Sequence, residues 1–229
     1  MYDIIKHYPK ADAELVAKFA EFDESASISE CLATPGAMNR DIKPVWPGTR
    51  MCGVAFTAHV RPGDNLLLHK ALDLIKPGDA LVVCCDGFAD SGGIWGGMMS
   101  ASAKARGAAG LVTDGSVRDS MLIKELGFPV YSRGLDVKKS TKMLPGMINH
   151  PIIIGGVLVN PGDIVFGDND AVVVIPRESA REVYERVKAR EEKEARALKR
   201  ILNGEGTTFD LDGGYIAAFK ALNISEEPD

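Results

Sequence analysis

The sequence contains few of the residues that build disulfide frameworks or zinc sites. Its 229 residues include 4 cysteines and 4 histidines. No two cysteines form a C-x-x-C pair, and Cys84 and Cys85 are neighbours on what reads as a buried strand. The histidines are scattered along the chain, at positions 7, 59, 69 and 150. We therefore expect structural or incidental cysteines and find little support for a zinc site.

Long hydrophobic runs and an excess of positive charge are also missing. The longest apolar stretches, such as residues 80–85 and 171–175, have the length of a strand, whereas a helix that crosses a bilayer needs about 20 residues. The N-terminus has no basic region leading into an apolar run, so we expect no secretory signal and a cytoplasmic protein without a membrane partner. The formal net charge of −5, without a Lys/Arg cluster beside aromatic residues, argues against nucleic acid as a partner.

What the sequence does contain is the alternation of strands and helices that is typical of an α/β fold. Hydrophobic residues make up 45% of the chain, which is ordinary for a protein with a substantial core. Apolar runs at 80–85, 109–113 and 129–132 predict strands joined by short helices, and this order favours parallel pairing. Short apolar runs split by glycine-rich turns over 152–175 predict an antiparallel or mixed sheet instead. The predicted helices cover residues 11–21, 27–34, 64–75, about 98–106, about 119–126 and, as one long charged helix, 177–203.

A glycine-rich segment, 86–97, leads from one of these strands directly into a helix. The amides at the start of a helix have no partner within it and lie at the positive end of the helix dipole, so they are suited to bind a carboxylate or a phosphate. The spacing matches neither G-x-G-x-x-G nor the phosphate-binding loop that ends in Gly-Lys-Ser/Thr. A plain tight turn between strand and helix explains the segment equally well.

A second polar segment, 114–119, follows the next strand with the sequence D-G-S-V-R-D. Ligand sites gather at the carboxyl ends of parallel strands. Arg118 can hold an anionic oxygen there, and Asp119 can bind a hard divalent cation. On spacing alone the alternative is simpler: Asp119 caps the following helix and Arg118 forms a surface ion pair.

Four stretches together resemble the RraA-like family, which includes the 4-hydroxy-4-methyl-2-oxoglutarate / 4-carboxy-4-hydroxy-2-oxoadipate aldolases. The resemblance covers roughly residues 25–205, and the D-G-x-x-R-D run with its upstream A-R-G is the most specific part. The stretches are P-G-D-N at 62–65, the run from A-R-G to R-D at 105–119, F-P-V-Y-S-R-G at 128–134, and V-N-P-G-D-I-V through D-N-D-A-V-V-V-I-P at 159–176.

The resemblance implies a fold and an assembly. The fold is a swivelling β/β/α-type α/β domain with mixed sheets, formed by the whole chain 1–229 and extended by a long C-terminal helix. Within it we expect N-terminal helices at about 11–34, a core at about 50–176, and a C-terminal helix and tail at 177–229. The implied assembly is a homotrimer or homohexamer with active sites between subunits.

The resemblance also implies roles for particular residues. In the aldolase members, the residue matching Asp119 holds Mg²⁺ or Mn²⁺, and the residue matching Arg118 binds the 2-oxo acid. The substrate carboxylate is received by the backbone amides of the glycine-rich helix start, which match Gly96, Gly97, Met98 and Met99. We therefore expect catalytic roles for Arg118 and Asp119.

One position departs from the family pattern. The aldolase members carry an acidic residue where this chain has Gly97, and that residue supports the metal through water. Its loss removes an anion that orients the ligands of the metal. Asp86 or Asp90, on the same loop, are the candidates to replace it.

The function implied is a lyase of the class II (metal-dependent) pyruvate aldolase type. It would cleave a 4-hydroxy-2-oxo dicarboxylate to pyruvate by a retro-aldol reaction, decarboxylate oxaloacetate, or do both, since both reactions pass through the pyruvate enolate. The alternative is a non-catalytic regulator that binds a ribonuclease E-like partner, as some family members do.

Overall fold

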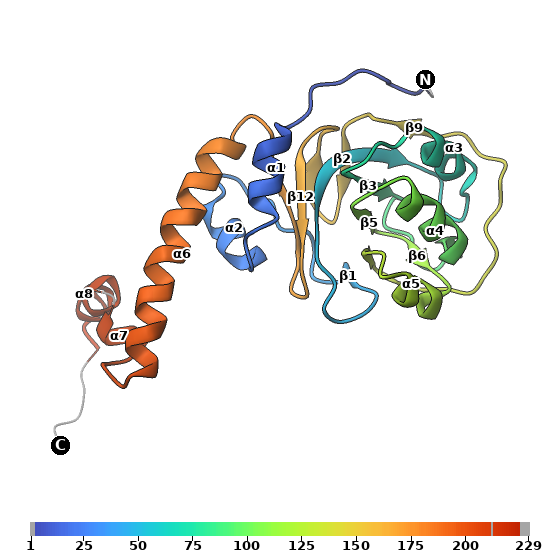
Figure 1. Cartoon of the computed structure of the whole chain (residues 1–229). Coiled ribbons are helices and arrows are strands. Elements are labelled where there is room, and N and C mark those ends of the chain that lie inside the picture. Colours follow the sequence, from blue (N-terminus) through green and yellow to red (C-terminus); the bar gives the residue numbers. More distant parts are fainter. Residues whose placement is uncertain (1–2, 212, 225–229) are drawn as a thin grey trace. The chain divides into compact units, whose positions relative to one another are not determined.

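The computed structural model describes residues 3–211 and 213–224 (Figure 1). The chain divides into two compact units, Met1–Tyr184 and Glu185–Asp229. The first unit contains every strand among the described residues, and the second is helical. Among the described residues, no helix combines the length and the apolar character that a bilayer crossing needs.

The first unit is built on a mixed sheet in the strand order β1-β7-β5-β3-β2-β12-β13, with β9 pairing on β2. Its centre is parallel, because β2, β3, β5 and β7 follow one another through crossovers. The edges are antiparallel, with β12 on β2 and β13 on β12. The strands are β1 (Lys43–Pro44), β2 (Met51–His59), β3 (Asp79–Cys84), β5 (Gly110–Thr113), β7 (Val130–Ser132), β9 (Met147–Ile148), β12 (Ile164–Gly167) and β13 (Val172–Ile175).

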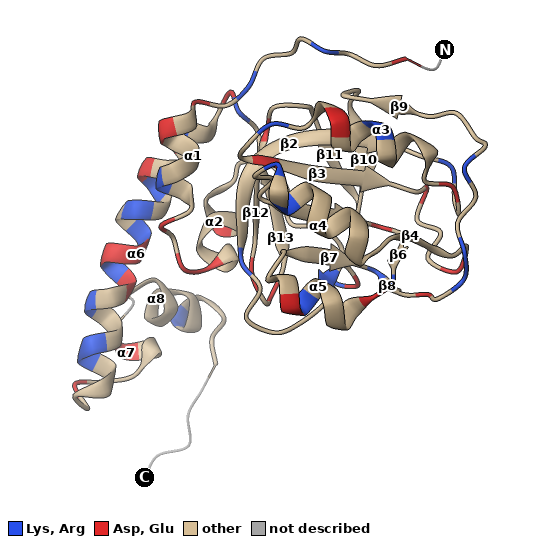
Figure 2. Ribbon diagram, turned by 45° about the vertical axis from the view of Figure 1, so that its right-hand side comes forward, with Lys and Arg blue, Asp and Glu red and all other residues tan. Residues whose placement is uncertain are grey.

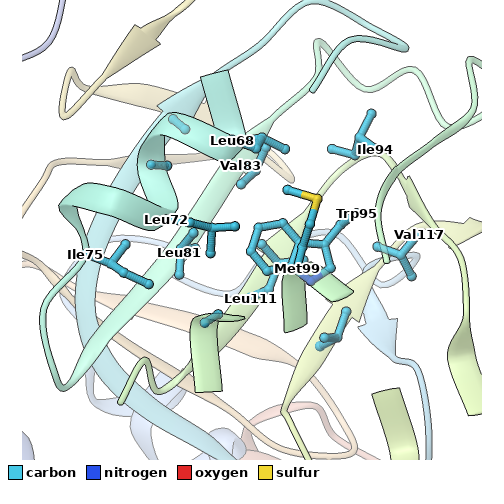
Figure 3. Packing of buried hydrophobic residues seen from close by; sticks show 14 of the residues in the cluster. Leu68, Leu72, Ile75, Leu81, Val83, Ile94, Trp95, Met99, Leu111 and Val117 are labelled. Carbon is cyan, nitrogen blue, oxygen red and sulfur yellow. The ribbon is translucent and has the colours of Figure 1, made fainter. Parts of the chain in front are cut away.

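Each face of this sheet has its own apolar core, because successive side chains of a strand point to opposite faces. On one face Leu81 and Val83 of β3 pack against α3 (Leu66–Leu74) and α4 (Gly97–Ala105), as Figure 3 shows for Leu68, Leu72 and Met99. On the other face Ala80 and Val82 pack under the antiparallel hairpin of β10 (Ile152–Ile154) and β11 (Val157–Val159). Cys84 belongs to this second face and Cys85 to the first.

A second, small parallel sheet lies beside the first and was not predicted. It consists of β4 (Gly93–Trp95), β6 (Ser116–Val117) and β8 (Gly134–Leu135) in the order β4-β6-β8. The expectation that all of 86–97 is a glycine-rich loop is therefore wrong for residues 93–95. Strands of two or three residues give no periodicity that a sequence could show.

The predicted helices are present with shifted ends. The N-terminal pair is α1 (Ala13–Phe19) and α2 (Ser25–Cys31), α5 spans Ser120–Leu126, and the long helix is α6 (Ala180–Leu202). Charged residues cover α6 along most of its length (Figure 2), and its apolar stripe is buried at Val183 but exposed at Leu198 and Leu202. The tail carries two further helices that were not predicted, α7 (Thr208–Leu211) and α8 (Gly213–Ala221).

These elements confirm the expected fold class, a mixed α/β domain with a C-terminal helix. Parallel pairing was predicted for the strands up to residue 132 and antiparallel pairing for 152–175, and the structure has both.

Candidate functional site

The small sheet brings together the two segments on which the function was predicted. Strands β4 and β6 are parallel, and their register places Trp95 opposite Val117. The residues that follow each strand, Gly96 and Gly97 on one side and Arg118 and Asp119 on the other, therefore leave the sheet next to each other. The Arg118 amide continues the ladder by donating to the Trp95 carbonyl at 2.9 Å.

Asp119 directs its carboxylate to the start of α4. Its Oδ2 accepts a hydrogen bond from the Gly97 amide, the first of that helix, at 3.0 Å. The backbone of Asp119 is left-handed, at φ 60° and ψ 37°, a conformation that aspartate tolerates better than most residues. Although Asp119 occupies the N-cap position of α5, its side chain makes no capping hydrogen bond there. The simpler interpretation is therefore wrong for the capping side chain of Asp119, whereas the exposed ion pair that it expected for Arg118 is present.

Arg118 lies beside this carboxylate with its guanidinium partly in solvent. Its Nε is 4.0 Å from Asp119 Oδ2, and the two side chains are 41% and 47% exposed. A pair that is so exposed contributes little to stability. Both groups remain accessible to a small anionic ligand.

Neighbouring side chains approach the two glycines closely. A Cβ added to Gly96 would lie 2.6 Å from Asp119 Oδ2 and 3.3 Å from Arg118 Cγ. A Cβ on Gly97 would lie 2.4 Å from Cδ2 of Leu122, on α5. An acidic side chain at position 97 would therefore displace Leu122, so the departure from the family pattern at Gly97 is matched by an apolar side chain that fills the space.

Hydrogen bonds of buried side chains hold the glycine-rich segment in a fixed position. Trp95 is fully buried, and its indole N–H donates to Ser100 Oγ at 2.7 Å (Figure 3 shows Trp95 beside Met99). The Asn65 side chain donates to the Ile94 carbonyl at 2.9 Å, and Ser140 Oγ donates to the Gly93 carbonyl at 2.7 Å. The amides at the start of α4 are thus fixed in place before any ligand arrives, which favours binding.

The donor set at this site fits a hard divalent cation only in part. Asp119 supplies one carboxylate, and Mg²⁺ is commonly held by one or two carboxylates while water and substrate oxygens complete its shell. Around Gly97 the neighbouring side chain is Leu122, which offers no ligand atom. A cation bound here would therefore depend on Asp119 and on the substrate's own oxygens.

Of the two candidates to replace the missing acid, Asp86 is engaged elsewhere. Its carboxylate contacts His59 Nε2 at 2.7 Å and Arg61 at 3.9 Å. For Asp90, the described hydrogen bond runs from Lys138 to its backbone carbonyl, at 3.1 Å. Replacement of the acid by either residue remains a prediction.

Arg133 follows β7, and the sequence leaves open whether it binds a distal carboxylate of the substrate or forms a structural ion pair. Its Nε is 2.7 Å from an Asp41 carboxylate oxygen, and its Nη1 donates to the Gly87 carbonyl at 2.6 Å. The ion pair neutralises the charge of the guanidinium, and the hydrogen bond occupies one of its N–H groups. The structure thus contains the ion pair, while a contact between Arg133 and a substrate stays a prediction.

Asp114, the first residue of the D-G-x-x-R-D run, shapes the backbone rather than facing the site. Its buried carboxylate accepts hydrogen bonds from the Cys85 amide at 2.6 Å and the Gly87 amide at 2.9 Å. Burial raises the pKa of this carboxyl despite those bonds. It thereby fixes the turn that begins the glycine-rich segment.

The sequence interpretation missed one cluster of possible metal ligands. His59, Cys84 and Asp86 each place one ligand atom within 4.8 Å of the others. Their separation in the sequence hides this grouping, because His59 and Cys84 are brought together only by the register of β2 and β3.

Comparison with known proteins identifies the family. The RraA-like family model, described as Aldolase/RraA, matches residues 25–174. A protein of Halalkalibacterium halodurans, named as a candidate 4-hydroxy-4-methyl-2-oxoglutarate aldolase, is 35% identical over 80% of this chain and 86% of its own.

Solved structures agree. An uncharacterized protein from Pseudomonas syringae pv. tomato has a TM-score of 0.79 at 28% identity, over 89% of this chain and 94% of its own. Streptomyces coelicolor RraAS2, described as an unusual member of the RNase ES inhibitor RraA protein family, has a TM-score of 0.74 at 29% identity, over 83% and 100%. The chain therefore belongs to the RraA-like family.

Proposed function

We propose that this protein is a divalent-metal-dependent lyase for small 2-oxo acids, with Arg118 and Asp119 as its catalytic residues. The reaction is retro-aldol cleavage of a 4-hydroxy-2-oxo dicarboxylate to pyruvate, decarboxylation of oxaloacetate, or both. The observation that carries the proposal is the position of the Asp119 carboxylate, which lies at the first amide of α4 beside a solvent-accessible guanidinium. The 35% identity to a candidate aldolase supports the same reaction class.

The start of α4 is suited to receive the carboxylate of the substrate. The first amides of a helix lack partners within it and carry the positive end of its dipole. Since the Gly97 amide is bound to Asp119, the amides of Met98 and Met99 are the ones left for a ligand. Arg118 adds a fixed positive charge at the same place.

Arg118 acts on the charge that develops during the reaction. Both cleavage and decarboxylation leave the electron pair of the broken C–C bond on pyruvate as an enolate. A preorganised guanidinium gains interaction energy as this charge forms, and donors of this kind contribute about 10²–10³-fold in rate.

Asp119 has two roles in the proposal. It would hold Mg²⁺ or Mn²⁺, which when bound supplies a Lewis acid for the 2-oxo group and its enolate. The hydrogen bond from Gly97 orients its carboxylate, so that it can direct removal of the proton from the 4-hydroxyl group in the retro-aldol reaction.

We also propose that the site is completed in a homotrimer or homohexamer by a neighbouring subunit. Large apolar side chains are exposed around it: Met98 and Met121 are each 79% exposed and Leu135 is 59% exposed. Apolar patches of this kind mark contact surfaces. In a single chain, Met98 and Met121, which flank the site, are exposed to water.

The assay that tests the function measures pyruvate. We expect release from oxaloacetate or from 4-hydroxy-4-methyl-2-oxoglutarate to stop after EDTA treatment and to return with Mg²⁺ or Mn²⁺. Turnover that is unaffected by metal removal would contradict a metal-dependent lyase. Light scattering on the same preparation measures the mass of the assembly, and a monomer would contradict the shared site.

The second candidate is a non-catalytic regulator that binds a ribonuclease E-like partner. Two observations favour it. The space beside Gly97 is filled by the apolar Leu122 side chain and not by an acidic group, and the chain is similar to S. coelicolor RraAS2. A pull-down with ribonuclease E as bait distinguishes the candidates, since the regulator binds and inhibits the nuclease while releasing no pyruvate.

A further inference from the structure

A second group of ligand atoms lies on the face of the main sheet that carries the β10–β11 hairpin. His59 Nε2 is 2.7 Å from Asp86 Oδ1. Together with Cys84 Sγ, one ring nitrogen of His59 and one carboxylate oxygen of Asp86 form a set of ligand atoms within 4.8 Å of one another. The set offers one imidazole nitrogen, one sulfur and one carboxylate oxygen. The contacts described for Arg118 and Asp119 involve none of these three residues.

The strand register explains why the three side chains meet. His59 ends β2 and Cys84 ends β3, and the two residues are partners in the parallel ladder. Partners in a ladder point to the same side of a sheet, and so do residues two apart along an extended chain. Asp86 follows Cys84 by two positions, with a left-handed backbone at φ 54° that ends the strand.

The environment of the cluster is closed on one side and open on the other. Cys84 is 6% exposed, whereas the side chains of His59 and Asp86 are 25% and 39% exposed. A cavity of about 260 Å³ is lined by Cys84 and Asp86 together with Asp114 and Arg133. An ion bound to the three ligand atoms therefore has a route to solvent and room for a further ligand.

We propose that His59, Cys84 and Asp86 form a second metal site, selective for a borderline transition ion such as Zn²⁺ or Co²⁺. Thiolate and imidazole ligands suit these ions, whereas Mg²⁺ prefers oxygen alone. Three protein ligands beside a cavity leave the fourth tetrahedral position to water or to a small ligand, as in zinc sites that are not purely structural.

Binding of the ion displaces the proton of the thiol. Burial and the nearby Asp114 carboxylate raise the pKa of Cys84 to about 12, so the metal-free protein holds this sulfur as a thiol. The ion binds the thiolate, and the proton is released to solvent. The His59–Asp86 hydrogen bond gives way to two bonds to the metal.

The experiment uses the full chain, stripped of metal with EDTA, dialysed and titrated with Co²⁺ alone. We expect one equivalent to produce a thiolate-to-cobalt charge-transfer band in the near ultraviolet and visible bands typical of four-coordinate Co²⁺. One equivalent of Zn²⁺ should then remove both. Absence of the charge-transfer band in the wild-type protein overturns the proposal without recourse to any variant.

Single substitutions identify which side chains bind the ion. Cys84→Ser should abolish the charge-transfer band, and His59→Ala and Asp86→Asn should each weaken Co²⁺ binding about tenfold or more, since even groups that only orient ligands cost that much. Cys52→Ser is the matched control, because Cys52 is a thiol on the adjacent strand β2 and belongs to no such group among the described residues. A band that persists in Cys84→Ser but disappears in Cys52→Ser overturns the assignment.

The proposals for this site and for the lyase site can be disproved independently of each other. Asp119→Asn should leave the cobalt spectrum unchanged even if it abolishes pyruvate release. Conversely, a missing cobalt signal in a protein that still cleaves substrate overturns only the second site. Loss of the cobalt spectrum in Asp119→Asn would show that one site had been mistaken for two.

Discussion

The two sites proposed for this protein differ in the chemistry of their ligand groups. At the start of α4, the ligand-binding groups are backbone amides, one guanidinium and one carboxylate, which together suit a small oxo acid and a hard cation. At the ends of β2 and β3, the groups are an imidazole, a thiol and a carboxylate, which suit a softer ion. The two groups come from different sheets: the first follows β4 and β6 of the small sheet, and the second lies at the ends of β2 and β3 of the main sheet.

The largest expected effect is a loss of pyruvate release when the first proposed site is altered. Arg118→Ala and Asp119→Asn should each lower kcat/KM for pyruvate release by about 10²–10³-fold, because each removes a charge that acts on the transition state. Arg106→Ala is the matched control: Arg106 follows α4, is similarly exposed and pairs with Asp73. Near-normal turnover in Arg118→Ala, measured by a coupled pyruvate assay, would contradict the site assignment.

A smaller effect is expected when the carboxylate is moved without being removed. The backbone of Gly96 is extended, so alanine is tolerated there, but its Cβ would lie 2.6 Å from Asp119 Oδ2. We expect Gly96→Ala to lower turnover about 10-fold to 100-fold through misplacement of that carboxylate. The thermal unfolding temperature should change far less than the rate. A variant that loses stability and rate together would point to a structural role for Gly96.

A third prediction concerns the pair formed by Gly97 and Leu122. Gly97→Ala should lower the free energy of unfolding by about 1–3 kcal/mol, because the new methyl overlaps Leu122. Adding Leu122→Ala should restore most of that loss. In the Leu122→Ala background, Gly97→Asp should tighten Mg²⁺ binding, which isothermal titration measures; equal Mg²⁺ affinity with and without the aspartate would refute a supporting acid at this position.

The last prediction concerns stability alone and tests the contribution of the buried Asp64 carboxylate. Buried Asp64 accepts hydrogen bonds from the amides of Leu66, Met143 and Leu144 and from Thr141 Oγ1. Burial opposes ionisation, but these bonds outweigh it and hold the pKa of Asp64 below its ordinary value of 3.8. Its charge therefore stabilises the fold above about pH 4, and this contribution is lost as the pH falls through the lowered pKa.

Asp64→Asn should accordingly cost about 1–3 kcal/mol at pH 7, and less in acid. Urea unfolding at several pH values measures the difference between variant and wild type. A difference that grows as the pH falls would have the wrong sign. Pyruvate release at pH 7, under conditions where the variant is folded, should stay close to the wild-type rate.

The two segments of the first proposed site could be recognised in the sequence because each of them is continuous. Arg118 and Asp119 are adjacent, and the helix start at Gly97 follows an unbroken glycine-rich stretch. What joins the two parts could not be predicted. Strands β4 and β6 have three and two residues, too few for a periodic pattern, and only their register places Gly97 beside Asp119.

Two further features depended on spatial information that a single sequence lacks. An aspartate before a helix predicts a capping side chain, and no local pattern indicates that Asp119 turns to the neighbouring helix instead. Likewise, His59 and Cys84 are separated by one helix and one strand, so their grouping appears only when β2 and β3 are paired in register. Side chains that meet through pairing of distant strands are the ones that sequence reasoning misses.

The most direct measurement is a crystal structure of the protein with pyruvate and Mg²⁺. The carboxylate of pyruvate should contact the amides of Met98 and Met99 and the Arg118 guanidinium, with Mg²⁺ between the ligand and Asp119. Pyruvate or Mg²⁺ bound only in the cavity beside Cys84, with Arg118 and Asp119 left in solvent, would contradict the account.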